Sequence, residues 1–132
     1  MPTSPNVIAA SGVALVTTAE TVITTTVARA VNAPGSQGQY IDGMINITPG
    51  TAATAVVIRV RAGNGLAGAV IGGPETHTVA AGANQSIPYA QIDGTTVGQV
   101  QYTLTAQQTA ATGNGSINLG TIREQTANSA GA

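Results

Sequence analysis

Apolar and polar residues alternate along three segments of the chain, and the alternation predicts β-strands. The segments are Gln39–Thr48, Thr54–Ala62 and Val97–Gln108. In a strand, successive side chains point to opposite faces, so a repeat of two residues places the apolar side chains on one face and the polar ones on the other. Each of these segments is therefore expected to bury one face in a shared core.

Weaker strand patterns fill the intervals between these segments. They are Gly12–Thr17, Thr21–Val31, Leu66–Ile71, Thr76–Ala80, Gln85–Ala90 and Ser116–Gln125. Gly and Pro recur at short intervals, including a predicted turn at Gly72–Glu75, and leave no window for a long helix. In the last segment the apolar positions change phase, which predicts a β-bulge near Gly120. The pattern predicts an all-β protein, a single antiparallel jelly roll or β-sandwich of about eight strands with no significant helix.

The two ends of the chain differ from this strand-rich middle. We expect an extended N-terminal arm over residues 1–11, a β-sandwich domain over 12–125 and a small polar tail over 126–132. Pro2 and Pro5 disfavour helix in the arm, and Val7 and Ile8 are its main apolar residues. So short a segment buries too little to offset an ordering entropy of roughly 1–2 kcal/mol per residue. The arm is therefore predicted to be ordered by a partner, along the edge of a neighbouring sheet.

The composition predicts a thin core. The chain has 132 residues, of which 42% are hydrophobic, but it contains no Phe, Trp or Cys and only three Tyr. Large aromatic side chains usually dominate core burial, so the strands here must bury Val, Ile and Ala instead. A small domain with such a core is expected to be marginally stable alone, and contacts with further copies would offset this. We therefore expect a homo-oligomer.

Low charge excludes some classes of partner. Charged residues make up 7% of the chain, against about 25% in typical soluble domains. The net charge of −1 favours neither nucleic acid nor an anionic membrane. No apolar run reaches the ~18–20 residues that span a bilayer, and residues 1–10 lack the features of a secretory signal.

No motif predicts catalysis, a cofactor or a metal. Gly63–Gly68 matches the G-x-G-x-x-G dinucleotide pattern, but the Gly72–Pro74 run that follows leaves no room for the helix that the motif must open. His77 is the single histidine, and no nucleophile elbow accompanies it. The acidic residues are isolated in sequence: Glu20, Asp42, Glu75, Asp93 and Glu124. We therefore expect no catalytic residue, no cofactor and no metal site.

Arg59 and Arg61 stand out because they share one face of one strand in a chain with four basic residues. Two rigid guanidinium groups could bind carboxylates or carbonyls of a partner, or the strand face could simply be solvated. Asp42 is also notable, since it lies on the polar face in the middle of the Gln39–Thr48 strand.

The order of elements resembles a known group of domains. Pro34–Gly38 precedes the strand Tyr40–Thr48, the Val-Val-Ile-Arg-Val-Arg strand follows, and Gly98–Thr105 comes later. This order is similar to the jelly-roll domains, some of them like tumour necrosis factor, of head decoration (cement) proteins and spikes of tailed bacteriophages. The resemblance covers residues 12–125. It implies that the Gly98–Thr105 strand lies toward a threefold axis, which makes Tyr102 a candidate interface residue.

The expected function is that of a non-enzymatic virion structural protein. It would decorate or cement the surface of a capsid and be assembled in the host cytoplasm. Its partners would be its own copies, a trimer being favoured over a dimer, and the major capsid protein or another virion protein. The candidate interface residues are Pro2, Pro5, Val7, Ile8, Arg59, Arg61 and Tyr102. The alternative is a receptor- or glycan-binding module of a spike or adhesin, and an enzyme ranks third.

Overall fold

All regular structure among the residues that the structure describes is β-structure. The computed structural model describes residues 6–15, 18–31, 39–93, 98–110 and 115–126. Its strands are β1 (Asn6–Ala10), β2 (Val13–Leu15), β3 (Thr21–Thr25), β4 (Arg29–Val31), β5 (Gln39–Thr48), β6 (Thr54–Ala62), β7 (Val70–Val79), β8 (Gln85–Asp93), β9 (Gly98–Val100), β10 (Tyr102–Gln108) and β11 (Gly115–Thr126). No helix that could cross a membrane occurs among these residues.

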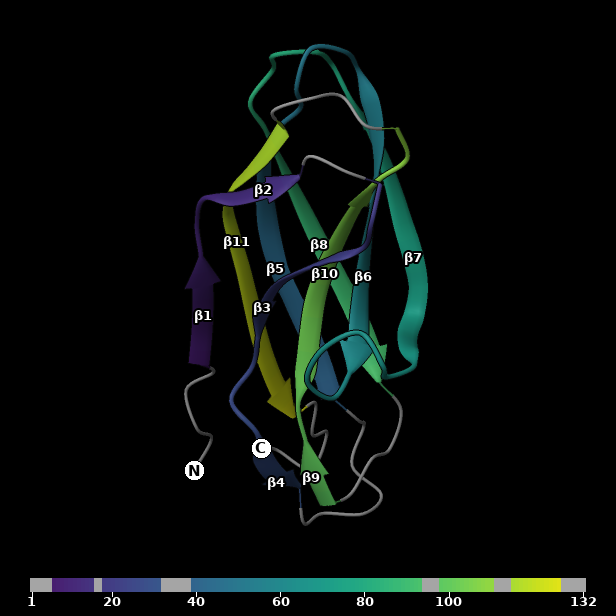
Figure 1. Cartoon of the computed structure of the whole chain (residues 1–132). Coiled ribbons are helices and arrows are strands. Elements are labelled where there is room, and N and C mark those ends of the chain that lie inside the picture. The colour runs from purple at the N-terminus through teal and green to yellow at the C-terminus, as the bar shows by residue number, and fades with distance from the viewer. Residues whose placement is uncertain (1–5, 16–17, 32–38, 94–97, 111–114, 127–132) are drawn as a thin grey trace.

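Two antiparallel sheets face each other as a sandwich (Figure 1). We call them sheet A, with the order β1-β11-β5-β8 and β2 also paired to β11, and sheet B, with the order β3-β10-β6-β7. Strands β4 and β9 form a small third sheet at one end. The pairs β1–β11, β3–β10, β5–β8 and β6–β7 are nested in sequence, like one long hairpin folded over on itself. This is jelly-roll winding, and it confirms the predicted all-β sandwich.

The core is built from the predicted apolar faces. Ile41, Ile45 and Ile47 of β5 are essentially inaccessible to solvent. They face sheet B, where β6 and β10 contribute the buried residues Val56, Ile58, Val60, Tyr102, Leu104 and Ala106. Almost all these side chains are aliphatic. The two sheets also approach each other closely at one glycine. At Gly120 of β11, a Cβ atom would overlap the Ile23 side chain.

Strand β7 differs from the prediction. Leu66–Ile71 and Thr76–Ala80 were expected to be separate strands with a turn at Gly72–Glu75, but Val70–Val79 is one continuous strand. Its register with β6 shifts between Ile58 and Val60, so the glycines bulge out of the ladder instead of ending it. Gly72 adopts a positive φ of 69°, a backbone conformation that glycine tolerates and that this bulge requires.

The irregularity of β11 agrees with the sequence. Its register with β5 shifts between Ile117 and Leu119, close to the bulge predicted near Gly120. The shift lets Ile117 and Ile122 both point into the core although their positions differ by five, an odd offset that would place them on opposite faces of a regular strand. Two other predicted strands are interrupted: Thr21–Val31 forms β3 and β4, and Val97–Gln108 forms β9 and β10.

The N-terminal segment was expected to be an arm that a partner orders, but part of it is ordered within this chain. Residues Asn6–Ala10 form β1, which pairs with Gly120–Glu124 of β11 in the same chain. Backbone hydrogen bonds along an existing strand order a segment that has little apolar surface of its own. Residues 1–5, with Pro2 and Pro5, and the predicted tail beyond Thr126 lie outside the described residues.

Candidate interaction surface

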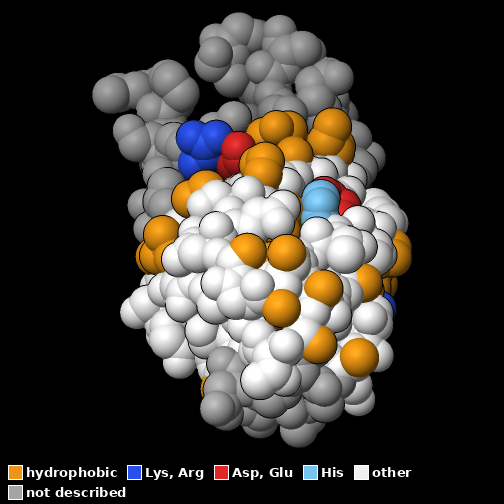
Figure 2. All heavy atoms as spheres, turned by 90° about the horizontal axis from the view of Figure 1, so that it is seen from above, with side chains coloured by type: hydrophobic (Ala, Val, Ile, Leu, Met, Phe, Trp, Pro, Cys, Tyr) orange, Lys and Arg blue, Asp and Glu red, His pale blue; other side chains and the backbone are white. Residues whose placement is uncertain are grey.

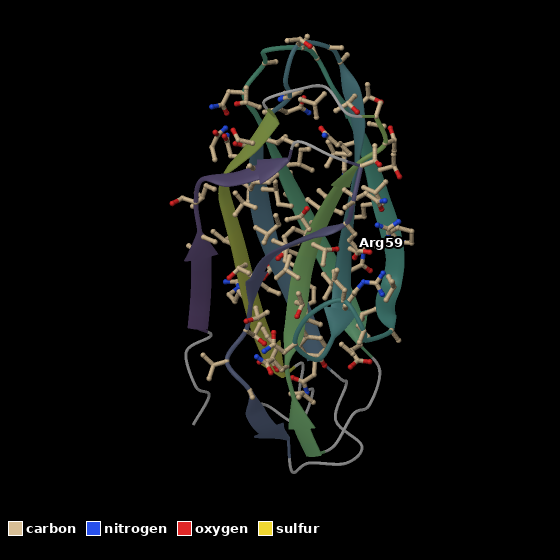
Figure 3. The ribbon with its side chains drawn as sticks, in the orientation of Figure 1. Arg59 is labelled. Carbon is tan, nitrogen blue, oxygen red and sulfur yellow. The ribbon has the colours of Figure 1, made fainter. Side chains whose placement is uncertain are left out.

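Arg59 (labelled in Figure 3) and Arg61 project from β6 on the outer face of sheet B. They do so because they alternate with the buried residues Ile58 and Val60. Their partners belong to the same chain. Arg61 donates from Nε and Nη2 to the two carboxylate oxygens of Glu20, at 2.7 Å each. Arg59 donates from Nη1 to Gln107 Oε1 at 2.7 Å and lies 3.7 Å from Glu20.

Glu20 connects the strands of this face. It precedes β3, and its Oε2 also accepts a hydrogen bond of 2.6 Å from the hydroxyl of Thr105 on β10. Gln107 of β10 in turn donates to the carbonyl of Thr18 at 2.9 Å. We call Glu20, Arg59, Arg61, Thr105 and Gln107 the outer-face network. The guanidinium groups thus bind a carboxylate and an amide oxygen of this chain, whereas the sequence pattern suggested groups of a partner or a solvated strand face.

The Gly63–Gly68 segment folds back over the same face. The Gly65 N–H donates to Thr103 Oγ1 at 3.0 Å, and that hydroxyl donates to the Gly63 carbonyl at 2.7 Å. Arg61 Nη1 donates to the Gly68 carbonyl at 2.8 Å. The G-x-G-x-x-G pattern is therefore a loop between β6 and β7 that covers β10, and no helix follows it. This cover explains why Thr103 is buried although it points away from the core, whereas the hydroxyl of Thr105, also buried, donates to Glu20.

The outer-face network should make stability depend on pH. The Arg61 hydrogen bonds lower the pKa of Glu20 to about 2 from its ordinary value of 4.5. A lowered pKa means that the folded state favours the carboxylate, so this stability is complete above pH 4.5 and is lost as pH falls toward 2.

We expect Glu20→Gln to lose about 1 kcal/mol of unfolding free energy at pH 7, because the pair is partly exposed and partly solvated. The difference from the wild type should shrink between pH 4.5 and pH 2 in urea titrations. Glu75→Gln is the matched control, and an equal pH-dependent loss in that variant would contradict the assignment to Glu20.

The remaining predicted interface residues fall in other places. Tyr102 is 1% exposed, and its hydroxyl donates to Asp93 at 2.7 Å. The prediction that this side chain meets a partner is wrong, because the side chain lies inside the sandwich. Val7 and Ile8 lie in β1, opposite Arg123 and Ile122 of β11.

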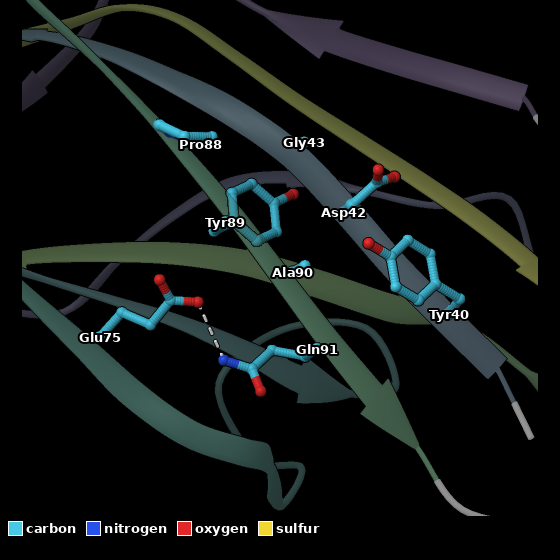
Figure 4. Close-up of a pocket in the computed structure, with 8 residues that line it drawn as sticks. All are labelled: Tyr40, Asp42, Gly43, Glu75, Pro88, Tyr89, Ala90 and Gln91. Atoms are coloured by element: carbon cyan, nitrogen blue, oxygen red, sulfur yellow. Dashed lines mark hydrogen bonds between the residues drawn. The ribbon is translucent and has the colours of Figure 1, made fainter.

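A hollow of about 600 Å³ lies beside β8 on the other side of the molecule (Figure 4). Its lining residues are Tyr40, Asp42, Gly43, Glu75, Pro88, Tyr89, Ala90 and Gln91. Asp42 accepts two hydrogen bonds from Arg123, at 2.8 and 2.6 Å. Gln91 Nε2 donates to Glu75 and to the Gly73 carbonyl, at 3.0 Å each, which ties β8 to the bulge of β7. Both carboxylates therefore already have partners.

Beside this hollow, the Tyr89 side chain makes a hydrogen bond to β11 where the ladder between β5 and β11 is interrupted. Strands β5 and β11 form no ladder pair at Gly43 or Met44, and the Tyr89 hydroxyl donates to the Thr121 carbonyl there at 2.7 Å. Gly43 leaves space for the ring, since a Cβ atom would lie 2.7 Å from the hydroxyl oxygen. Burial raises the pKa of Tyr89, and the charges of Asp42 and Glu75 raise it further. The ring therefore serves as a neutral hydrogen-bond donor.

His77 has one acidic neighbour. Its Nε2 lies 3.6 Å from Glu75 Oε1, which is too far for a hydrogen bond. Within the described part of the chain, no group of three His, Cys, Asp or Glu side chains could hold a metal ion.

The outer face of sheet A carries an uncharged stripe along β8. Pro88, Ala90 and Ile92 are exposed and alternate with the buried residues Ile87 and Tyr89. Ile92 is 60% exposed, the largest exposed fraction among the bulky apolar side chains described. The end of the sandwich seen from above (Figure 2) is likewise mostly backbone and uncharged polar side chains, with apolar side chains scattered between them and a few charged ones.

Sequence analysis missed Glu20 and the contact of Tyr89 with Thr121. Glu20 is 41 residues away from Arg61, and nothing in its local sequence indicates the pairing. Tyr89 fits the alternation of β8, but its hydroxyl partner is a backbone carbonyl two strands away.

Comparison with known proteins shows similarity of fold. No family model and no curated protein matches the chain. A structure of the infectious bursal disease virus Gx strain matches 99% of this chain at 10% identity, with a TM-score of 0.55. The VP2 subviral particle of infectious bursal disease virus matches 98% at 14% identity, with a TM-score of 0.51. This chain spans about a third of each virus chain, 35% and 34%. A jelly-roll sandwich of this kind therefore also occurs in virus particles.

Another match is to a Bacillus endospore appendage structure, described as disulfide-linked pili. It covers 95% of this chain and 93% of that chain at 19% identity. Its TM-score of 0.43 is too low to support an inference.

Proposed function

We propose that the protein is a non-enzymatic structural component of a virion, which decorates or cements the surface of a capsid. It associates with its own copies, as a trimer in preference to a dimer, and binds a capsid subunit. The observation that carries the proposal is the uncharged stripe of exposed residues along β8, Pro88, Ala90 and Ile92, on the outer face of sheet A. The fold similarity to chains of virus particles supports it. Bacteriophage origin rests on the resemblance of strand order alone.

The stripe along β8 has the properties of a surface that a partner can cover. Charged side chains cost desolvation energy when a partner covers them, whereas small apolar side chains gain from burial. Pro88 lies within the edge strand β8 and disfavours the addition of another strand there. A partner would therefore cover the side-chain face of β8. Arg59 and Arg61, each already bonded within the outer-face network, are secondary candidates for contact.

The test is quantitative mass spectrometry of particles purified on density gradients. We expect this chain at a fixed ratio to the coat subunit, and its absence from such particles would contradict the proposal. Ile92→Asp should lower the number of copies per particle without changing thermal stability. Leu66→Asp is the matched control, since Leu66 is also exposed but lies in the loop over sheet B. His77→Ala should bind particles like the wild type.

A receptor- or glycan-binding module is the second candidate, and the hollow beside β8 favours it. Tyr40 offers a partly exposed ring, and Asp42 and Gln91 offer polar groups near it. An oligosaccharide array tests this directly. Binding by the wild type that is lost in Tyr40→Ala, with folding preserved, would favour this candidate over the capsid role.

A further inference from the structure

Strand β1 is a short edge strand of the jelly roll that pairs with a single neighbour. It has five residues and stands at the edge of sheet A, where its ladder joins it to β11 alone (Figure 1). Most other main strands are longer or have ladders on both sides. The free energy needed to detach an edge strand of this kind is much smaller than that of global unfolding.

The connection after β1 can act as a hinge. Ser11 and Gly12 lie between β1 and β2 and belong to neither strand. Gly12 has a positive φ of 69°, and a Cβ atom there would have no neighbour within 4 Å. Beyond it, β2 keeps its own pairing with Gly115–Ile117 of β11. The chain can therefore change direction at Gly12 while β2 stays in place.

Departure of β1 would leave a specific acceptor on β11. Residues Gly120–Glu124 would lose their ladder on that side, while their pairing with β5 remains on the other. Unpaired backbone groups beside buried residues such as Ile122 are costly. A strand of the same sequence from a second copy restores this pairing in the same register, so exchange loses no ladder bonds.

The other sheet edges are less suited to a partner strand. Edge strands β8 and β7 contain Pro88 and Pro74, and β7 is also bulged. Edge strand β3 has a register shift of its own against β10. Proline and bulges are common devices against edge pairing. In the described part of β1 there is neither.

We propose that β1 is exchanged between copies of this chain, so that Asn6–Ala10 of one copy pairs with Gly120–Glu124 of the next. The inference rests on the self-association proposed above and not on attachment to a capsid. It gives the N-terminal segment a partner: the same strand edge in another copy. Reciprocal exchange between two copies yields a dimer, and cyclic exchange among three yields the favoured trimer.

Disulfide trapping in the full chain tests the exchange. The chain has no cysteine, so Val7→Cys with Arg123→Cys introduces one possible pair, at positions directly opposite in the ladder. Direct cross-strand neighbours lie close enough for a disulfide after small adjustments. Asn46→Cys with Ser86→Cys is the matched control, because β5 and β8 are register partners that are not proposed to exchange.

After oxidation at low protein concentration, the Val7–Arg123 cysteine pair should link separate chains, and a non-reducing gel should show two or three linked chains. The control pair should close within single chains, and each single-cysteine variant should stay unlinked. Light scattering after size exclusion gives the assembly size of the same samples. A disulfide closed within one chain in an oligomeric sample would overturn the exchange and leave self-association intact. A closed disulfide in a monomer would overturn both.

Discussion

Replacing Leu104 with asparagine should lower the free energy of unfolding by about 4 kcal/mol. Leu104 is 0% exposed, at the middle of β10, where it lies opposite Val60 of β6 and Thr24 of β3. The substitution removes aliphatic contacts and buries an amide in a core that is mainly aliphatic. Ile45→Asn, on the facing sheet, should have a similar effect for the same reason. Urea titration monitored by far-UV circular dichroism measures both.

The matched control for Leu104 is Leu66→Asn in the loop over sheet B. Leu66 is 46% exposed, so the change should stay within about 0.5 kcal/mol of the wild type. Equal losses in the two leucine variants would show that the sandwich core is not where the structure places it.

Replacing Gly43 with alanine should cost about 3 kcal/mol, although alanine is usually the smallest change possible at a glycine. The added methyl group would overlap the Thr121 carbonyl oxygen and press on the Tyr89 hydroxyl. Both groups are fixed, since the hydroxyl donates to that carbonyl between β5 and β11. Relief of the overlap requires β5 and β11 to separate or the Tyr89 ring to leave its site.

Gly73→Ala is the control for Gly43, because a Cβ atom at Gly73 would meet nothing within 4 Å. We expect that variant to unfold within about 0.5 kcal/mol of the wild type. Thermal denaturation of both variants is sufficient to separate them. A Gly43→Ala protein as stable as Gly73→Ala would mean that Tyr89 does not cross Gly43.

Leu104 and Gly43 differ in what makes each position sensitive to substitution. Leu104 tests a position whose burial follows from alternation along one strand. Gly43 tests a position whose constraint comes from two other strands, β8 and β11. The proposed exchange of β1 belongs to the second kind, since it depends on which strand edge lies beside Asn6–Ala10.

The sequence by itself determined which face of most strands is buried. Alternation identified the inward residues of β5, β6 and β10, and a change of phase located the bulge of β11. It also indicated a β-sandwich or jelly roll, because turn residues separate many short strands at short intervals. These properties are local: a strand repeats every two residues, whatever lies beside it.

Only the tertiary structure decided what each strand meets. It paired Arg61 with Glu20, enclosed Tyr102, joined the two halves of β7 through a bulge and laid β1 along β11. The physical reason is that strands carry the same backbone donors and acceptors whatever their sequence, so pairing depends on the winding of the whole chain. Residues far apart in sequence come together only once that winding is complete. Which side chains stay exposed is therefore also decided by the whole fold.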